Sequence, residues 1–450
     1  MMRCPASVER WLSEPIHGCP CGRKHPIGLR KVVLAPGALD LAEDLLPEGE
    51  RASTLLLLAD TDTYEAAGAR VAGVLRGAGR AIREAILERK PLADGTTLER
   101  LREELGCRPC RVVAVGSGTI SDLGKIVAAE AGVPLMTVGT AASMNGYSSS
   151  IAALTISGLK ATRPASPPDI LLLDTLVLAA APPRLTRAGF GDLCSKPVSS
   201  ADWVLSHRLL GDPLCPTALS LAGEAASRAR AKAEEIGRGD PPAVETLAEA
   251  LVLSGLSMTI AGASSPASGG EHLLSHYLDM SAEGWGREPA LHGEQVAVGT
   301  LACLALYERL RRASPPEADA PAPSEESAEE LAALHSHLGQ RALGGVLAEA
   351  RAKSSRRPGR AERRRLLACG WADLWASLDS QLAASEGIGE DLFRARVPRT
   401  FGEIGVEGPY AVQLLRLARH IRNRYTALDL AADLGGLDRW AGEIAAELAG

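Results

Sequence analysis

Short apolar runs alternate with amphipathic segments through the first 185 positions of the chain. The apolar runs lie at residues 31–35, 54–60, 81–87, 111–116, 134–140, 151–156 and 169–174, and helical patterns lie between them at residues 64–76 and 97–105. Apolar runs without polar alternation indicate strands buried on both faces, and intervening helices indicate a parallel sheet covered on two sides. We therefore predict an α/β domain over residues 1–185, of which residues 1–30 are an N-terminal extension.

The pattern changes after Pro182 and Pro183, where the strand-like runs stop and long Ala- and Leu-rich helical periodicity begins. We predict a second, all-helical domain over residues 186–450. Within it, residues 313–330 are rich in Pro, Ala and acidic side chains without apolar periodicity, so we expect a mobile surface loop. The basic segment at residues 351–365 lacks interleaved aromatic residues, and we expect a solvated helix face or loop rather than a nucleic-acid site.

Composition narrows the class of protein. With 450 residues, 46% hydrophobic and 23% charged, the chain has the composition of a globular protein of two or three domains. A net charge of −6 leaves no basic surplus to neutralise a nucleic-acid backbone, so we expect a small-molecule partner and no nucleic acid. Because no apolar run reaches the ~18 residues of a membrane span and the first residues lack the apolar core of a signal peptide, we expect a cytoplasmic protein.

Nine scattered cysteines differ from the dense framework of a small secreted domain, so we expect free thiols. One group stands out near the N-terminus, where Cys19, Cys21 and His25 lie within the sequence HGCPCGRKH. It could form a small zinc site. However, Cys-x-Cys is tighter than the usual spacing of structural zinc ligands, and no second pair with matching spacing follows. We therefore favour a loop with buried thiols over a metal site.

A nucleotide site is suggested by the strand at residues 111–116, which runs directly into GSGTISD. Gly116 and Gly118 then lie where a strand turns into a helix, and such a turn presents backbone N–H groups and a positive helix end to phosphate. Because position 121 is Ser, the complete G-x-G-x-x-G pattern is absent, and the glycines could equally serve only a tight turn.

Two further segments favour the nucleotide interpretation. Asp60 ends the run at residues 54–60, where a carboxylate could accept hydrogen bonds from an adenosine ribose, although a lone Asp could also be a turn former. A loop rich in Thr, Ser and Gly lies at residues 140–150, directly after the apolar run at residues 134–140. The carboxyl end of a buried strand is where an open α/β sheet binds ligands, so we expect both segments near the nucleotide.

Four polar residues in the helical region form a candidate metal site. His272 and His276 are four positions apart, so both imidazoles lie on one face of a predicted helix that begins after residues 268–270. His292 precedes the next helix, and Asp192 lies upstream in AGFGDLCSK. One carboxylate with two or three neutral nitrogens suits a catalytic divalent metal that keeps one position open. Satisfied core or surface histidines are the alternative, but the shared glycine-rich contexts favour a metal.

Six motifs occur in order along residues 31–435: GSGTISD, TAASMNGYSSS, AGFGDLCSK, SGGEHLLSH, LHGEQ and RHIRNRYTALDLAADLG. With these motifs the chain resembles the bacterial sn-glycerol-1-phosphate dehydrogenases. That family is a branch of the superfamily that contains glycerol dehydrogenase, iron-containing alcohol dehydrogenases and 3-dehydroquinate synthase. The resemblance implies a dehydroquinate synthase-like fold: an α/β nucleotide-binding domain, an all-α metal-binding domain, and a cleft between them that holds metal and substrate.

The resemblance also implies roles for particular residues. Metal ligands are matched by Asp192, His272 and His292, a substrate contact by His276, the ribose contact by Asp60, and dinucleotide contacts by Gly116, Ser117, Gly118, Thr119, Ile120, Thr140, Ser143 and Ser149. The implied reaction is the reduction of dihydroxyacetone phosphate to sn-glycerol 1-phosphate, in which a divalent metal polarises the carbonyl while NAD(P)H delivers hydride. Zinc, nickel and iron all suit such ligands, and a cytoplasmic homodimer serving phospholipid metabolism is implied.

One position departs from the family pattern. Relatives have an Asp that contacts substrate where this chain has Asn145, and Asn keeps the hydrogen-bonding geometry but carries no charge and takes no proton. Three alternatives therefore stay open: a dehydrogenase of another polyol, a dehydroquinate synthase-like cyclase, and a catalytically weakened nucleotide- or metal-binding relative. The Asp of GFGD argues against the synthase, which uses Glu as its ligand. Asp60 favours NADH over NADPH because it would repel a 2′-phosphate, although the family uses both.

Overall fold

The structure is a computed structural model that describes residues 4–12, 16, 18–50, 53–105, 111–156, 158–282, 284–318, 328–338 and 340–450. The chain forms two compact units. Unit 1 consists of Met1–Ile156, Ala161–Leu193 and Cys215–Ser264, and unit 2 of Ser157–Lys160, Cys194–Leu214 and Ser265–Gly450. The chain therefore crosses between the units several times, whereas the sequence pattern marks one boundary near residue 185. That boundary, as a division into functional domains, stays a prediction.

A six-stranded parallel sheet forms the centre of unit 1, as the apolar runs predict. Its strands follow the order β1-β8-β5-β4-β2-β3, and every described pairing between them is parallel. The strands are β1 (Lys31–Ala35), β8 (Ile170–Asp174), β5 (Leu135–Gly139), β4 (Arg111–Gly116), β2 (Leu55–Asp60) and β3 (Ile82–Leu87). Parallel strands require crossover connections, which the intervening helices supply.

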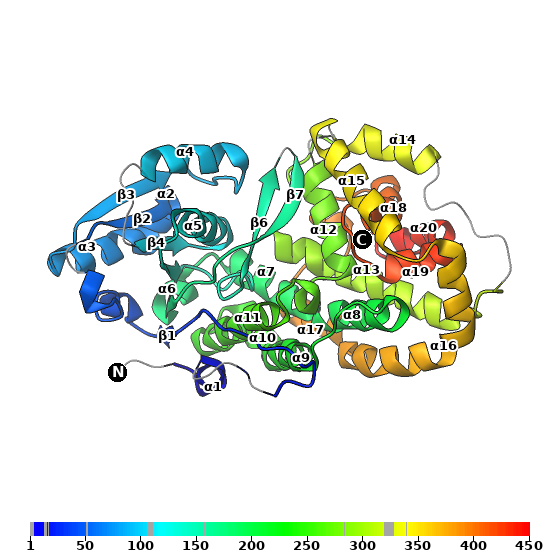
Figure 1. Ribbon diagram of the computed structural model, residues 1–450, viewed down its shortest axis with the longest axis horizontal. Coiled ribbons are helices and arrows are strands. Elements are labelled where there is room, and N and C mark those ends of the chain that lie inside the picture. The colour runs from blue at the N-terminus through cyan, green and yellow to red at the C-terminus, as the bar shows by residue number, and fades with distance from the viewer. Residues whose placement is uncertain are drawn as a thin grey trace. The chain divides into compact units, whose positions relative to one another are not determined.

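Both faces of this sheet are covered. Leu55 and Leu57 of β2 join a hydrophobic cluster with α3 (Ala69–Gly77), while Leu56 and Leu58 join a cluster on the opposite face with α4 (Gly95–Leu105) and α5 (Gly118–Ala131) (Figure 1). Successive side chains of a strand point to opposite faces, so a run of leucines is buried on both. The carboxyl ends of the strands are thereby held at one edge, where β4 leads into α5.

One predicted strand lies elsewhere. Residues 151–156 form β6 (Ile151–Ile156), which does not belong to the parallel sheet but pairs with β7 (Leu159–Pro164) in a separate two-stranded sheet. Buried and half-buried positions alternate along the first part of β6, whereas β8 is buried throughout, so only one face of β6 is covered. The expectation that residues 151–156 join the parallel sheet is therefore wrong, and β7, with its charged sequence LKATRP, was not predicted.

Several helices after residue 174 also belong to unit 1. They are α6 (Thr175–Ala180), most of α7 (Pro183–Cys194), α9 (Pro216–Arg230), α10 (Ala233–Arg238) and α11 (Pro241–Ala261), and α1 (Ala6–Leu12) precedes the sheet. Among the described residues, α11 is long and apolar enough to cross a membrane, but 83% of its apolar window is buried inside the protein. Because α11 packs against α9 and α6, we interpret it as a core helix.

Unit 2 is helical, which confirms the predicted helical C-terminal part. Its helices are α8 (Lys196–Leu210), α12 (Gly270–Ser281), α13 (His292–Arg312), α14 (Ala328–His337), α15 (Gln340–Arg356), α16 (Arg360–Leu382), α17 (Ile388–Arg394), α18 (Gly408–Leu417), α19 (Ala427–Asp433) and α20 (Leu437–Glu447) (Figure 1). Part of the loop expected at 313–330, residues 319–327, lies outside the described residues. Its last residues, 328–330, already belong to α14.

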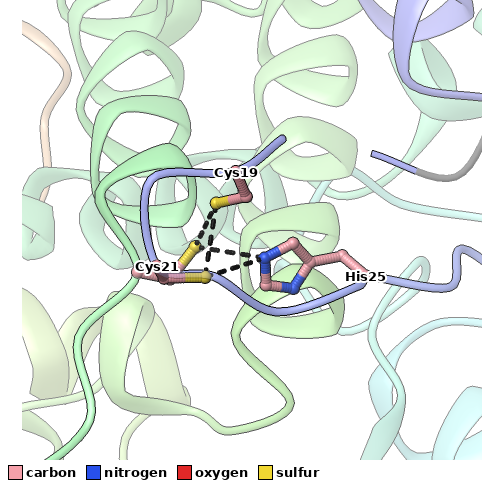
Figure 2. A group of neighbouring side chains, drawn as sticks. Cys19, Cys21 and His25 are labelled. Atoms are coloured by element: carbon pink, nitrogen blue, oxygen red, sulfur yellow. Dashed lines mark hydrogen bonds between the residues drawn. The ribbon is translucent and has the colours of Figure 1, made fainter. Parts of the chain in front are cut away.

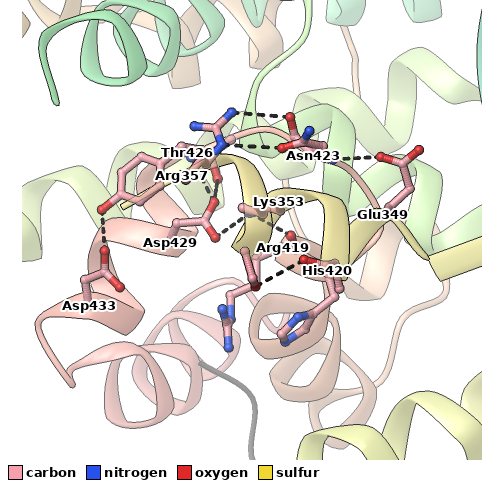
Figure 3. A network of polar contacts seen from close by, with 12 residues as sticks. Glu349, Lys353, Arg357, Arg419, His420, Asn423, Thr426, Asp429 and Asp433 are labelled. Atoms are coloured by element: carbon pink, nitrogen blue, oxygen red, sulfur yellow. Dashed lines mark hydrogen bonds and ion pairs between the residues drawn. The ribbon is translucent and has the colours of Figure 1, made fainter. Parts of the chain in front are cut away.

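The basic segment at 351–365 is not simply a solvated face. Arg360 and Arg363 are each only 6% exposed and both bind the carboxylate of Asp433, at 2.9 and 2.6 Å. Lys353 binds Asp429 at 2.5 Å and belongs to a larger polar network in unit 2 (Figure 3). Burial of a cation is tolerated where a carboxylate pairs with it, so these side chains pack the helices together and do not form a free basic surface.

Candidate metal centre and nucleotide loop

Three histidines come together in unit 2. His272 and His276 lie one turn apart on α12, and His292 is the first residue of α13. Their ring centroids are 6.2 Å apart for His272 and His276, 5.1 Å for His272 and His292, and 5.9 Å for His276 and His292. The helical spacing inferred from the sequence therefore accounts for His272 and His276, and the start of α13 brings His292 into the same cluster.

A buried carboxylate orients the first of these rings. Nδ1 of His272 lies 2.9 Å from Oε1 of Glu271, which is fully buried and also accepts the N–H of Gly269 at 2.7 Å. An ionised carboxylate only accepts hydrogen bonds, so Nδ1 of the neutral His272 ring carries the proton and the ring's lone pair lies on Nε2. A carboxylate behind a histidine is the arrangement that orients such a ligand toward a metal.

A chain of hydrogen bonds fixes the tautomer of His292 in the same way. The amide nitrogen of Gln295 donates to Oδ1 of Asp279 at 3.1 Å and to the carbonyl of Ala290 at 3.0 Å, so its oxygen faces Ser275. The hydroxyl of Ser275 donates to that oxygen at 2.7 Å. The hydroxyl oxygen then accepts from Nδ1–H of His292 at 3.0 Å, which leaves Nε2 of His292 unprotonated.

His276 differs from its two neighbours. It is 8% exposed, and its Nδ1 is buried without a protein hydrogen-bond partner. Burial, followed by the positive charge of Arg422, by the two neighbouring imidazoles and by Lys160, lowers the pKa of His276 well below its ordinary value, so the ring is neutral at pH 7. Arg422 and Lys160 are thus the cations whose fields reach the cluster, and the sequence interpretation assigned neither a role.

The start of α12 is held by Asp202 of α8. Its carboxylate is 1% exposed and accepts the N–H of Gly270 at 2.6 Å, the N–H of Ala427 at 2.8 Å and the hydroxyl of Tyr307 at 2.5 Å. Burial, followed by the charge of Glu271, raises the pKa of Asp202 to about 7. The folded protein therefore retains near neutral pH a proton that an unfolded chain releases at about pH 4.

The predicted carboxylate ligand lies in unit 1. Asp192 is 1% exposed near the end of α7, and its Oδ2 accepts the backbone N–H of Asn145 at 3.2 Å. The side-chain amide of Asn145 donates to the hydroxyl of Ser254 at 3.2 Å. A Cβ atom at Gly189 would lie 2.0 Å from the carbonyl oxygen of Ala142, so α7 needs glycine there to approach this loop. The structure therefore places Asp192 and Asn145 side by side.

The predicted phosphate-binding turn has the expected geometry. Gly116 ends β4, and Ser117 precedes α5 without using its side chain as a cap. A Cβ atom at Gly116 would lie 2.5 Å from the Cβ of Ile120, which explains the glycine. The N–H groups of Gly118, Thr119 and Ile120 form the first turn of α5, where no intrahelical acceptor exists, and such groups can bind an anion.

A buried lysine anchors the hydroxyl-rich loop that follows β5. Lys125 of α5 is fully buried, and its ammonium donates to the hydroxyl of Ser149 at 3.0 Å and to the carbonyl of Ile151 at 2.9 Å. The N–H of Thr140 donates to the carbonyl of Gly116 at 3.1 Å, which joins the loop to the turn. The hydroxyl of Ser149 thus has partners within its own loop, and its contact with a cofactor stays a prediction.

Two other residues predicted to contact the cofactor, Asp60 at the end of β2 and Ser143 in the loop after β5, belong to unit 1. Oδ1 of Asp60 accepts the N–H of Thr63 at 2.8 Å, and the hydroxyl of Thr63 accepts the N–H of Asp60 at 3.0 Å. Asp60 therefore caps the turn after β2, and a ribose contact stays a prediction. Ser143 is partly buried within the loop at 140–150. The sequence interpretation missed Lys125, although a single lysine among the apolar residues of a predicted helix was a signal that could have indicated it. It also missed Ser275 and Gln295, for which the sequence gives no local signal.

Comparison with known proteins agrees with this architecture. Residues 33–182 match the family described as iron-containing alcohol dehydrogenase. A glycerol-1-phosphate dehydrogenase [NAD(P)+] of Halalkalibacterium halodurans is 35% identical over 299 residues, which span 65% of this chain and 75% of that protein. A protein of the same name from Hyperthermus butylicus is 35% identical over 283 residues, spanning 62% of this chain and 78% of its own length.

Solved structures show the same fold. A probable glycerol dehydrogenase from Sinorhizobium meliloti 1021 aligns with a TM-score of 0.61 at 19% identity, covering 92% of this chain and 98% of its own. Glycerol dehydrogenase from Schizosaccharomyces pombe aligns with a TM-score of 0.60 at 16% identity, covering 93% and 91%. Together with the relatives of 35% identity, these alignments show that the chain belongs to the glycerol-1-phosphate dehydrogenase family.

Proposed function

We propose that the protein is an NAD(P)-dependent glycerol-1-phosphate dehydrogenase that reduces dihydroxyacetone phosphate to sn-glycerol 1-phosphate. The observation that carries the proposal is the orientation of His272 and His292, each hydrogen-bonded through Nδ1, so that the lone pair able to ligate a metal lies on Nε2 of both rings. Two separate hydrogen bonds, from His272 to Glu271 and from His292 to Ser275, select the same tautomer in both rings. Histidines that only pack in a core do not require this agreement. The names of the relatives, which specify glycerol 1-phosphate and NAD(P)+, agree with this assignment.

The metal ligands in this proposal are Asp192, His272 and His292. One carboxylate and two neutral imidazole nitrogens form the donor set of a catalytic divalent ion, and zinc, nickel and iron all accept it. The ion supplies Lewis-acid polarisation of the substrate carbonyl when it is bound. The chain fits this group chemically, because both histidines have their second nitrogen held by Glu271 or Ser275.

The substrate is the small phosphorylated ketone, and two kinds of residue would bind it. Arg422 and Lys160, whose charges act on His276, attract the phosphate group. His276 contacts the substrate, since its buried Nδ1 has no protein partner and a substrate oxygen or hydroxyl would satisfy it. Asn145, beside Asp192, adds a neutral hydrogen bond in the position where the family resemblance implies a charged residue.

The nicotinamide cofactor would bind along the carboxyl edge of the parallel sheet. The N–H groups at residues 116–120 would hold its pyrophosphate, Asp60 its ribose, and Thr140, Ser143 and Ser149 the remainder. In the proposed reaction the reduced nicotinamide donates a hydride to the carbonyl carbon of the substrate, and the carbonyl oxygen takes a proton. We further propose that the enzyme works as a cytoplasmic homodimer in phospholipid metabolism, as the resemblance implies.

A spectrophotometric assay tests the function. Purified, metal-loaded protein is mixed with NADH or NADPH and dihydroxyacetone phosphate, with and without a chelator. We expect oxidation of at least one cofactor, sensitive to the chelator and much faster with dihydroxyacetone phosphate than with dihydroxyacetone. A preference for the unphosphorylated ketone would support a polyol dehydrogenase instead, and no oxidation with either cofactor would support a weakened binding protein, which Asn145 makes the main rival.

A further inference from the structure

A second group of potential metal ligands lies in unit 1. Cys19, Cys21 and His25 belong to the N-terminal extension, and their side chains point toward one another (Figure 2). The fourth member is Cys215, the residue immediately before α9, which is 196 positions after Cys19. One ligand atom from each of the four residues can be chosen so that all lie within 4.8 Å of one another. The sequence interpretation found no partner for the Cys-x-Cys pair because the missing ligand is so far along the chain.

The distances within this cluster suit tetrahedral coordination. The sulfur of Cys19 is 3.3 Å from that of Cys21 and 3.6 Å from that of Cys215. Nε2 of His25 is 3.1 Å from the sulfur of Cys21 and 3.7 Å from that of Cys215. With zinc–sulfur bonds of about 2.3 Å and zinc–nitrogen bonds of about 2.0 Å, a tetrahedron has sulfur–sulfur edges of about 3.8 Å and sulfur–nitrogen edges of about 3.5 Å. The four atoms are therefore already near the corners of such a site.

The surroundings of the cluster are those of a closed site. Cys19 is 7% exposed, His25 4% and Cys215 2%. The hydroxyl of Thr217, in the first turn of α9, lies 3.2 Å from the sulfur of Cys19, where it could donate to a thiolate. None of the described cysteines is joined in a disulfide, so all three sulfurs of the cluster are available as ligands. Cys21 is only partly buried, but its sulfur lies against the buried Cys19, and a shared metal ion would explain why three thiols converge without a bond between them.

We propose that Cys19, Cys21, His25 and Cys215 form a structural zinc site, separate from the catalytic centre. Three cysteines and one histidine are a common donor set for structural zinc, and four protein ligands leave no position open for a substrate. Borderline-soft ligands of this kind select zinc over calcium or magnesium. The proposal rests on the cluster alone and is independent of the function assigned to the chain.

The site would fasten the N-terminal extension to the helices of unit 1. Cys19 and Cys21 lie shortly before β1, whereas Cys215 starts α9, so one ion would link two segments that are distant in sequence. The same helices already hold α1, since Arg10 binds Glu224 at 2.6 Å and Ser7 hydrogen-bonds to Glu249. The exposed Arg10–Glu224 pair contributes little by itself, whereas metal binding contributes directly to folding free energy.

Cobalt substitution tests the proposal on the full chain. Thiolate ligands give cobalt(II) a sulfur-to-metal charge-transfer band, which the proposed Asp/His/His centre cannot produce because it contains no sulfur. We expect the band in cobalt-loaded wild-type protein but not in Cys215→Ser. In protein purified with zinc, we expect Cys215→Ser to contain one equivalent of zinc per chain less than the wild type. The matched control is Cys369→Ser, which alters an exposed cysteine and should leave both the band and the zinc content unchanged.

Two results would overturn the proposal. One is cobalt-loaded wild-type protein whose thiols are reduced but which shows no charge-transfer band. The other is a disulfide among Cys19, Cys21 and Cys215, detected by mass spectrometry of protein alkylated without reduction. If Cys215→Ser fails to fold, the wild-type spectrum still decides the question. Because these readouts do not depend on turnover, an inactive protein that binds zinc here would refute the proposed function and support this site.

Discussion

Replacing Ser275 by Ala should weaken the catalytic metal centre without touching a ligand. Ser275 is fully buried and links Nδ1 of His292, at 3.0 Å, to the oxygen of Gln295, at 2.7 Å. Alanine removes the acceptor that holds His292 in the Nδ1–H tautomer. The Nε2–H tautomer, which cannot bind a metal through Nε2, then becomes accessible. We expect metal affinity to fall by about 10- to 100-fold, the usual effect of losing a residue that orients a ligand.

The same substitution also has a cost in stability. The amide oxygen of Gln295 is in a side chain only 2% exposed, and it loses its hydrogen-bond donor. A buried polar group left without its partner costs about 1–3 kcal/mol. A control variant must therefore separate the loss of stability from the loss of metal affinity, and Ser281→Ala is such a variant. Ser281 is equally buried in α12, and its hydroxyl binds the carbonyl of Tyr277 and the hydroxyl of Tyr410, away from the histidines.

The assay compares Ser275→Ala with Ser281→Ala. Denaturant unfolding gives the loss of stability in each variant, and the metal concentration for half-maximal NAD(P)H oxidation gives the metal affinity. Both variants should lose stability to a similar degree, but only Ser275→Ala should require more metal. If the two variants require equal metal concentrations, the hydrogen bonds that lead from Asp279 through Gln295 and Ser275 to His292 do not select the tautomer of this ligand, and the argument is refuted.

Three further substitutions probe the substrate position, the phosphate site and a buried carboxyl. Asn145→Asp should raise kcat by tenfold or more, because it restores the charged substrate contact that the family resemblance implies, and the hydroxyl of Ser254 can turn to donate to the new carboxylate; an unchanged kcat would contradict a role for this position. Arg422→Gln should raise KM for dihydroxyacetone phosphate by about tenfold or more, the loss of one charged hydrogen bond, and leave turnover of dihydroxyacetone unchanged. For Asp202, whose pKa is raised from about 4 when unfolded to about 7, the folded state binds the extra proton, so the contribution of this group to wild-type stability should fall as pH rises from 4 to 7. Asp202→Asn should flatten that fall by up to about 4 kcal/mol in pH-dependent unfolding, and parallel profiles would contradict the shift.

Much of the fold could be predicted because burial on both faces leaves a clear pattern in the sequence. The leucines of β2 and the valines of β4 form unbroken apolar runs, and the structure places them in the centre of the sheet. β6 has a similar composition but a different setting, since pairing with β7 depends on contacts that a local pattern does not encode. The packing of α9 and α11 within unit 1 depends on long-range contacts in the same way.

The candidate site shows the same division. His272 and His276 could be grouped from their helical spacing, and the glycine-rich flanks brought Asp192 and His292 into the same hypothesis. Ser275 and Gln295 could not be recognised, because an isolated Ser or Gln on a helix has no distinctive pattern until its partners are known. Cys215 was missed for a related reason: it is a single cysteine that joins its proposed partners only through the fold.

The stereochemistry of the reverse reaction tests the central claim most directly. Metal-loaded protein is given NAD+ or NADP+ with enantiomerically pure sn-glycerol 1-phosphate, and in parallel with sn-glycerol 3-phosphate. The account predicts cofactor reduction with sn-glycerol 1-phosphate alone, abolished by a chelator and restored by adding back the divalent metal. Reduction with sn-glycerol 3-phosphate, with neither enantiomer, or at an undiminished rate after the metal has been removed would contradict it.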